Sequence, residues 1–322
     1  MLVMLVPGMV WGEMVALLEG IMKPTDSMIV HESRLYLTEG STVFLYSLSD
    51  YKLIKKFGRK GEGPQEFKST PTILPRKDHL LLNSQGKLSY FTKDGEFIKE
   101  RKVGSGLTFQ LLPVKDGFIG ITILIEKNMV YRALSFYDND LNKGKQIYRT
   151  EFGERGGKRE LLGDTFNYKV IADRLFVVNS SEFTFDVLDH SGNKIKTITR
   201  DHKRRPFTKG DEKNIHEILK LQLGAQYEVA KNFFSLPKDH WPAIISLISA
   251  DEKLYVPTWN IKDNKIEFFI YDAEGNELGH KYIPFAFRNA FQPFPWTINK
   301  GKIYQVIENE DEEWELHISK IE

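Results

Sequence analysis

The stretch Phe57-Gly58-Arg59-Lys60-Gly61-Glu62-Gly63-Pro64-Gln65-Glu66-Phe67 decides the fold, because it is a shaped loop that recurs along the chain. Apolar residues flank it on both sides, so it connects two predicted strands. Its glycines, Gly61 and Gly63 in particular, are expected to hold backbone angles that side chains resist. A degenerate second copy, Phe152-Gly153-Glu154-Arg155-Gly156-Gly157, lies in the middle of the chain. A loop that recurs indicates a structural unit that recurs.

Four-stranded units repeat along the chain, and their second and third strands are the clearest copies. Second strands are predicted at residues 34–37, 79–82, 118–121, 174–178, 253–256 and 302–306. Third strands are predicted at residues 43–46, 88–91, 133–137, 183–188, 266–271 and 314–318. A glycine stands four positions after the last apolar residue of the third strand at Gly95, Gly192 and Gly275, with Asp in the same turn. Because Asp caps such turns and Gly takes the left-handed position, this spacing predicts β-hairpins.

Six units of about 40–50 residues predict an all-β, six-bladed β-propeller, a single domain over residues 1–322. Stacked blades bury both faces of each sheet, and a closed ring hides the sheet edges. The sixth unit lacks a fourth strand, because the chain ends at Glu322 soon after the third. Residues 14–21 are largely apolar and belong to no unit of their own, so we expect them to supply that strand and close the ring.

Residues 207–240 interrupt the repeat between the fourth and fifth units, and we expect a helical insertion there. Thr208, with Asp211 three positions later, is typical of a capping box. Ile215 and Leu219 follow with helical spacing. In a propeller this connector lies on the same face as the glycine-rich loop, so the insertion is expected to cover that face as a lid.

The charge balance and the cysteine content exclude several classes of protein. With 45 Lys and Arg residues against 44 Asp and Glu residues, the chain has no overall field that would attract nucleic acid. It contains no cysteine, so no disulfide, thiolate metal site or thiol nucleophile is available. We therefore expect no nucleic-acid partner.

Residues 1–12 are apolar and uncharged. They are interpreted either as the remnant of a secretion signal whose basic region is missing, or as an N-terminal strand. Pro7 and Glu13 interrupt the run before it reaches the ~20 residues that a membrane span requires. We therefore expect no membrane span.

The loop at residues 57–67 resembles the FG-x-x-G-x-GP-x-EF pattern of bacterial six-bladed β-propellers of the NHL and TolB-like kind. The strand and Asp-x-x-Gly hairpin units look like that family's blades over essentially the whole chain. The resemblance implies an interaction role and a periplasmic or extracellular location, with a cytoplasmic location as the alternative. Many such proteins carry a lipid on a cysteine, and this chain has none to carry it.

Catalytic and metal-binding patterns are weak, so we assign no catalytic residue, no metal ligand and no cofactor. Eight histidines occur without a His-Glu-x-x-His motif, and no Gly-x-Ser-x-Gly pattern occurs. Asp138-Asn139-Asp140-Leu141-Asn142 alternates oxygen-bearing side chains like a calcium loop, but its glycine falls one place late and Arg149 stands where such loops carry Glu. A polar hairpin is the preferred alternative.

Basic residues gather in three connectors that a propeller places on one face. These are Lys55, Lys56, Arg59 and Lys60; then Arg155, Lys158 and Arg159; then Arg200, Lys203, Arg204 and Arg205. The candidate ligand-binding residues, on opposite sides of the channel mouth, are Arg59, Lys60, Arg204 and Arg205. The acidic turn at residues 308–313 lies on the same face, so a solvated surface of mixed charge is the alternative.

Tryptophans form a second candidate set. Trp241, Trp259 and Trp296 come from the fifth and sixth units, and two of them lie where first strands begin near the channel. They are interpreted either as packing between blades or as an aromatic binding surface at the channel mouth.

Together these patterns predict a non-enzymatic, ligand- or protein-binding β-propeller that is monomeric and needs no cofactor. The expected ligand is a small molecule or a protein, acidic in character, bound at the channel mouth on the lid face. The alternative is a hydrolase of the propeller lactonase type with a metal in the central channel.

Overall fold

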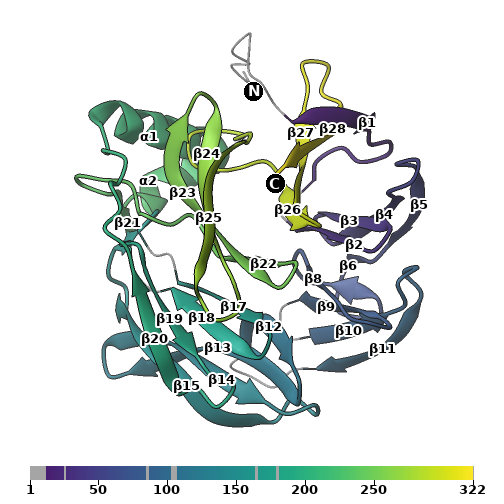
Figure 1. The fold of residues 1–322 in the computed structure, drawn as a ribbon, viewed down its shortest axis with the longest axis horizontal. Coiled ribbons are helices and arrows are strands. Elements are labelled where there is room, and N and C mark those ends of the chain that lie inside the picture. Colours follow the sequence, from purple (N-terminus) through teal and green to yellow (C-terminus); the bar gives the residue numbers. More distant parts are fainter. Residues whose placement is uncertain are drawn as a thin grey trace. The chain divides into compact units, whose positions relative to one another are not determined.

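Six four-stranded sheets hold most of the strands in the computed structural model, which describes residues 12–24, 27–84, 87–102, 107–163, 166–178 and 181–321 (Figure 1). Five of these sheets follow the chain as a meander, so that strands adjacent in sequence pair in space, and in the remaining one β1 pairs with β28. The prediction of an all-β, six-bladed β-propeller with a helical insertion between the fourth and fifth blades is confirmed.

The first three blades are β2–β5 (Met28–His31, Arg34–Glu39, Thr42–Ser47, Leu53–Phe57), β8–β11 (Thr72–Pro75, Leu80–Ser84, Lys87–Phe91, Phe97–Lys102) and β12–β15 (Leu107–Val114, Gly117–Glu126, Met129–Tyr137, Lys143–Glu154). The fourth and fifth are β17–β20 (Asn167–Ile171, Arg174–Val178, Thr184–Leu188, Lys194–Thr199) and β22–β25 (Ile248–Ala250, Lys253–Lys262, Lys265–Tyr271, Glu277–Pro284). The sixth joins β26–β28 (Trp296–Asn299, Lys302–Glu308, Trp314–Lys320) to β1 (Glu13–Leu17).

Contacts divide the chain into two compact units. The first holds residues up to 122, 134–145 and from 293 onward, which include the first, second and sixth blades. The second holds residues 123–133 and 146–292, which include the fourth and fifth blades and the insertion. The third blade contributes to both units.

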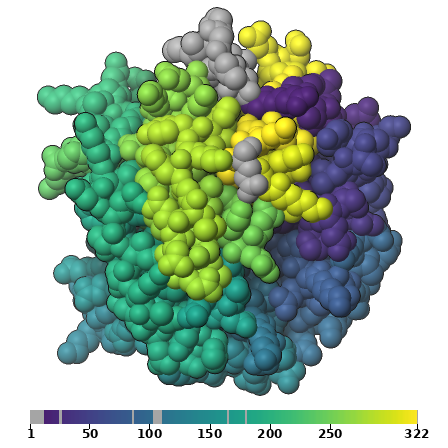
Figure 2. Space-filling view, in the orientation of Figure 1, coloured from purple at the N-terminus to yellow at the C-terminus, as the bar shows by residue number. Residues whose placement is uncertain are grey.

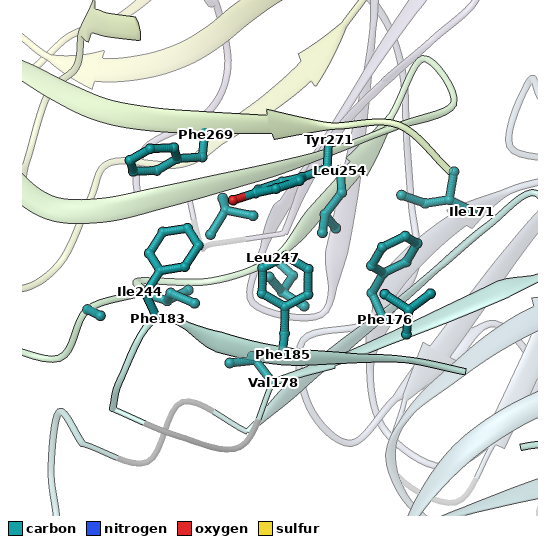
Figure 3. Packing of buried hydrophobic residues seen from close by; sticks show 13 residues of the cluster. Ile171, Phe176, Val178, Phe183, Phe185, Ile244, Leu247, Leu254, Phe269 and Tyr271 are labelled. Atoms are coloured by element: carbon teal, nitrogen blue, oxygen red, sulfur yellow. The ribbon is translucent and has the colours of Figure 1, made fainter. Parts of the chain in front are cut away.

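Buried aromatic residues fill the core of the second unit between β17–β20 and β22–β25 (Figure 3). Phe183 packs edge-on against Phe269 with ring centroids 4.9 Å apart, and Phe185 meets Tyr271 in the same way at 5.3 Å. Edge-to-face pairs at these separations add to the free energy of burying the rings. Because neighbouring blades cover both faces of a sheet, the strands carry apolar residues on both faces, which explains why β18 reads as Leu-Phe-Val-Val without alternation.

The hairpin turns after the third strand place a residue of positive φ against the preceding blade. Gly275 has a φ of +75°, and a Cβ there would lie 2.7 Å from Cδ1 of Ile198. Asp272 begins the same turn, and its Oδ1 accepts a hydrogen bond from the backbone N–H of Asn276 at 2.7 Å. Its Oδ2 accepts a second one, from Nδ2 of Asn276, at 2.9 Å. The glycine is therefore needed both for its backbone angle and for blade packing.

The substitution Gly275→Ala should lower the free energy of unfolding by about 1–3 kcal/mol. A left-handed L-residue costs about 1–2 kcal/mol, and displacing Ile198 adds to that cost. The matched control is Gly279→Ala in β25, where a Cβ meets nothing within 4 Å and φ is ordinary. Urea denaturation should leave the control unchanged or slightly stabilised; equal losses in both variants would contradict the packing role of Gly275.

The glycine-rich loop at residues 57–67 folds around the carboxylate of Glu66. Two short strands, β6 (Arg59–Lys60) and β7 (Glu66–Phe67), pair in parallel within it. Oε2 of Glu66 accepts the backbone N–H of Gly63 at 2.8 Å. Gly58 and Gly61 have φ angles of +79° and +153°, whereas Gly63 lies outside the positive-φ region. The prediction that both Gly61 and Gly63 hold backbone angles that side chains resist is therefore wrong for Gly63. Gly63 instead leaves room for Glu66, because a Cβ would lie 3.1 Å from its Oε2.

The fourth strand of the last blade comes from the N-terminal segment. β1 pairs antiparallel with β28, with Glu13 opposite Ile318 and Leu17 opposite Glu315. Leu18 and Ile21 follow β1 and are buried. Residues 1–11 lie outside the described part of the chain, so the choice between a signal remnant and a strand remains a prediction there.

The insertion begins with α1 (Lys209–Leu223), capped by the predicted box in which Thr208 and Asp211 each accept from the other's backbone N–H. A 3-10 turn and the short α2 (Tyr227–Ala230) follow. Next comes β21 (Phe234–Ser235), which pairs in parallel with β16 (Arg159–Glu160). β16 follows the second glycine-rich loop by one residue, so the insertion pairs with the segment that continues this loop. Within the described residues, no helix is long and apolar enough to cross a membrane.

Candidate binding site

A basic connector leaves β20 and runs to the insertion along the wall of a cavity of about 600 Å³. We call this the basic cavity. It is lined by Arg200, Asp201, His202, Lys203, Arg204, Arg205, Pro206, Asn260, Ile261, Glu267, Phe269 and Tyr282. All of these residues belong to the second compact unit. β25 carries Tyr282 of this lining. It lies on the face of the molecule seen in Figure 2, where it is coloured yellow-green.

A buried carboxylate, Glu267, forms the floor of the basic cavity, with 6% of its side chain exposed. Both of its oxygens accept hydrogen bonds from surrounding side chains. Oε2 accepts from His202 Nε2 (2.7 Å), Thr258 Oγ1 (2.6 Å) and Asn260 Nδ2 (3.1 Å). Oε1 accepts from His280 Nε2 (2.8 Å) and Tyr282 Oη (3.3 Å). Five donors thus converge on one charge.

These contacts decide the protonation state of Glu267. Burial alone would raise the pKa, but hydrogen bonds from His202, Thr258 and His280 outweigh it and lower the pKa of Glu267 to about 2. The carboxylate is therefore ionised at neutral pH. Because an ionised carboxylate only accepts, both histidines must carry their proton on Nε2.

The strand register explains why these side chains meet. Glu267 on β24 stands directly opposite Tyr282 on β25, and His280 lies two residues further along the same face. On the other side, β23 carries a register shift between Pro257 and Ile261. Thr258 and Asn260 lie within this irregularity, which turns both side chains toward the carboxylate.

The cations at the rim differ in how far they are already paired. Arg200 pairs with Glu277. Arg204 pairs with Glu182 at 3.0 Å, and Arg205 pairs with Asp211 at 2.7 Å. Lys203 is exposed and has no ion pair within the described residues. Lys203 is therefore the rim cation most available to a ligand.

The structure brings four of the predicted ligand-binding residues together in the second unit. Arg205 lies over the ring of Trp241, with its guanidinium carbon 4.7 Å from the ring centroid. Trp241 in turn packs on Trp259 at 4.7 Å. Both tryptophans are buried, at 0% and 5% exposure, in the core of the insertion with Ile215 and Tyr227. Their rings pack inside the insertion and are not available at the surface of the basic cavity.

The other predicted residues lie in the first unit. Arg59 is exposed, and its Nε donates to Oε1 of Glu66 at 2.8 Å. Lys60 is exposed beside it, and Trp296 is half-buried in β26. The role of these three residues in binding remains a prediction.

The sequence interpretation missed Glu267 and its donors. One signal was present: Glu267 is the only charged residue inside the run Ile266–Tyr271 of the predicted strand. A carboxylate at such a position must find donors or lose its charge. The donors themselves come from three separate segments, the connector after β20, β23 and β25, and only the folded chain brings them together.

Metal-binding patterns are absent from the described residues, which contain no group of three or more His, Asp or Glu side chains able to hold an ion. The calcium-like segment at Asp138 forms the polar hairpin that was the preferred alternative. Oδ1 of Asp138 accepts the backbone N–H groups of Asp140 and Asn142, both at 2.9 Å. The side-chain oxygens of Asp138 therefore stabilise the hairpin turn that contains them.

Comparison with known proteins supports the fold. No protein-family model and no curated protein matches this sequence. A candidate exported protein from Bacteroides fragilis is 11% identical, with a TM-score of 0.53 over 97% of this chain and 94% of that one. A member of the DUF4221 family from Bacteroides vulgatus is 13% identical, with a TM-score of 0.51 over 97% of both chains. At these identities the likeness shows the fold alone, and membership of the NHL or TolB-like family is not shown.

Proposed function

We propose that this protein is a non-enzymatic binding propeller that receives an anionic group in the basic cavity. Lys203 carries the proposal, because it is an exposed and unpaired cation among the described residues at the rim of a cavity of about 600 Å³. Arg204 and Arg205 stand next to it in the connector. Their ion pairs with Glu182 and Asp211 hold them in place. A cavity of this size is in the range that holds small ligands or the side chains of a partner.

The state of Glu267 favours binding over catalysis. A general acid or base works best when its pKa lies near the operating pH, and a pKa of about 2 is far from neutrality. The two oxygens are also fully used by five donors. Glu267 therefore acts as an anchor that fixes the cavity wall.

A hydrolase is the second candidate, and one residue favours it. The side chain of His280 is 42% exposed, and its Nε2 is held by Glu267. An imidazole oriented by a carboxylate is a common general base. Turnover of ester or lactone probes by the parent protein, lost in His280→Ala, would support this candidate over the binding propeller.

We place the protein in the periplasm or outside the cell. The resemblance of the glycine-rich loop to bacterial propellers supports this location, as does the structural likeness to a candidate exported protein. Fractionation of the source cells with an antibody to the native chain tests it.

Binding of acidic probes should depend on salt and on Lys203. Fluorescence titration with short acidic peptides and with galacturonic acid oligomers should give tighter binding at low salt. Raising the ionic strength from 0.1 M to 1 M shortens the Debye length from ~10 Å to ~3 Å and should weaken binding. Lys203→Glu, which breaks no ion pair, should weaken binding at least tenfold, and Arg204→Glu should act in the same direction.

Arg59→Glu separates this proposal from the wider sequence hypothesis. If only the basic cavity is used, Arg59→Glu leaves binding unchanged. If the ligand also contacts Arg59 and Lys60, this variant weakens binding as well. If binding changes neither with salt nor in Lys203→Glu, Arg204→Glu and Arg59→Glu, the basic connectors are ordinary solvated loops and the proposal is wrong.

A further inference from the structure

A second cavity adjoins the insertion and carries an excess of lysines. Its volume is about 630 Å³. We call it the lysine groove; it is lined by Lys158, Phe207, Thr208, Lys209, Glu212, His216, Lys231, Asn232, Phe234, Ser235, Leu236, Pro237 and Lys238. Lys231 pairs with Glu228, whereas the other three lysines have no ion pair within the described residues. With Glu212 as its one carboxylate, the groove has the charge of a site for an anionic occupant.

The lysine groove and the basic cavity share one connector. Arg205 and Pro206 line the basic cavity, and Phe207, Thr208 and Lys209 line the groove. Two neighbouring residues therefore border different cavities. From Arg205 to Thr208 the chain can reach at most about 11 Å, so an extended segment of about six residues is long enough to enter both.

β21 borders the groove, and its second edge has no strand partner within the described residues. The carbonyls of Phe233 and Ser235 accept hydrogen bonds from the backbone N–H groups of Arg159 and Leu161, so they face β16. In a parallel ladder, alternate residues of a strand direct their backbone groups to opposite sides. The N–H and C=O of Phe234 thus face away from β16, and no hydrogen bond to either occurs within the described residues. Such an edge accepts another extended peptide.

From these features we propose that the occupant is an extended acidic segment of a partner protein. It lies in the lysine groove, pairs with the edge of β21 at Phe234, and continues into the basic cavity. This inference rests on the proposed function, because it makes the anion bound in the basic cavity one part of a longer acidic chain. The unpaired edge favours a peptide over an acidic polysaccharide, which offers no matching backbone.

Peptide length tests the inference. Two labelled peptides of alternating Glu and Ser, four and twelve residues long, are titrated against the full chain by fluorescence anisotropy at low salt. The twelve-residue peptide should bind at least tenfold more tightly, because its second contact becomes intramolecular. The double variant Lys209→Glu/Lys238→Glu should remove that gain and leave the four-residue peptide unaffected. Lys115→Glu, an exposed lysine that lines neither cavity, is the control and should change nothing.

Hydrogen exchange adds a readout for the strand edge. The amide of Phe234 should exchange more slowly when the twelve-residue peptide is bound. A long peptide that binds no tighter than the short one, or a double variant that retains the gain, overturns the inference. So does an unprotected Phe234 amide, or a galacturonic acid oligomer of equal charge that binds more tightly. If the short peptide still depends on Lys203 in those cases, the proposed function stands; if neither peptide binds, both fail.

Discussion

Removal of residues 1–22 should strongly destabilise this protein, so that its unfolding becomes broad rather than cooperative and begins at a lower temperature. Without β1, the outer edge of β28 loses its partner, and a row of backbone groups is left unpaired. The buried side chains of Leu18 and Ile21 are lost as well, each worth about 1.5–3 kcal/mol.

Four side-chain hydrogen bonds to backbone carbonyls of the segment are lost as well, two of them from aromatic donors. Nε1 of Trp314 donates to the carbonyl of Met22 at 2.9 Å, and Oη of Tyr46 in the first blade donates to the carbonyl of Glu19 at 2.9 Å. A buried donor left without its acceptor costs about 1–3 kcal/mol. The combined loss of roughly 5–12 kcal/mol is comparable with the whole stability of a typical domain.

Circular dichroism during heating measures the effect. The truncated chain should show a broad transition at lower temperature, and a synthetic peptide of residues 12–22 added in excess should restore part of the loss. If the truncated chain melts as sharply and at the same temperature as the parent, β1 is dispensable and its pairing with β28 contributes little.

Replacing Glu267 with Ala should lower the free energy of unfolding by about 3–5 kcal/mol. Removing one partner of a buried charged network leaves its remaining members uncompensated, and here five donors lose their common acceptor. Glu274→Ala is the matched control, because Glu274 is an exposed carboxylate in the turn between the two strands that hold the cluster. It should cost less than about 0.5 kcal/mol.

The same carboxylate makes stability depend on acid. The pKa of Glu267 is lowered from 4.5 to about 2 in the folded state, so its contribution is fully present above the unfolded value of 4.5. It is lost as the pH falls from about 5 toward 2 and amounts to roughly 3 kcal/mol. Urea denaturation of the parent and of Glu267→Gln across this range measures it. The difference between them should shrink as the pH falls; a constant difference would show that Glu267 is not held ionised.

Local patterns predicted the blades because each depends on residues close in sequence. The turn that begins at Asp272 and reaches its positive φ at Gly275 is complete within five residues. The cap formed by Thr208 and Asp211 needs only four. Such features can be read from the sequence because their partners are fixed by spacing alone.

The candidate site could not be predicted in the same way. Thr258 and Asn260 donate hydrogen bonds to Glu267 only because β23 is irregular between Pro257 and Ile261. The residue types in this segment do not predict that irregularity. Arg59 looks like a free cation in the sequence, yet Glu66 pairs with it from across its own loop. Trp241 looks like a candidate binding surface until the fold shows that the insertion buries it.

The two glycine-rich loops differ in where they find a strand partner. In the first, β6 pairs with β7 from the same loop, so the loop is self-contained. After the second, β16 pairs with β21, which the insertion supplies more than seventy residues later in the chain. The insertion therefore cannot be moved or removed on its own. Any graft of residues 207–240 onto another propeller must carry residues 152–161 with it. A version of this chain that lacks the insertion must provide β16 with another strand in place of β21.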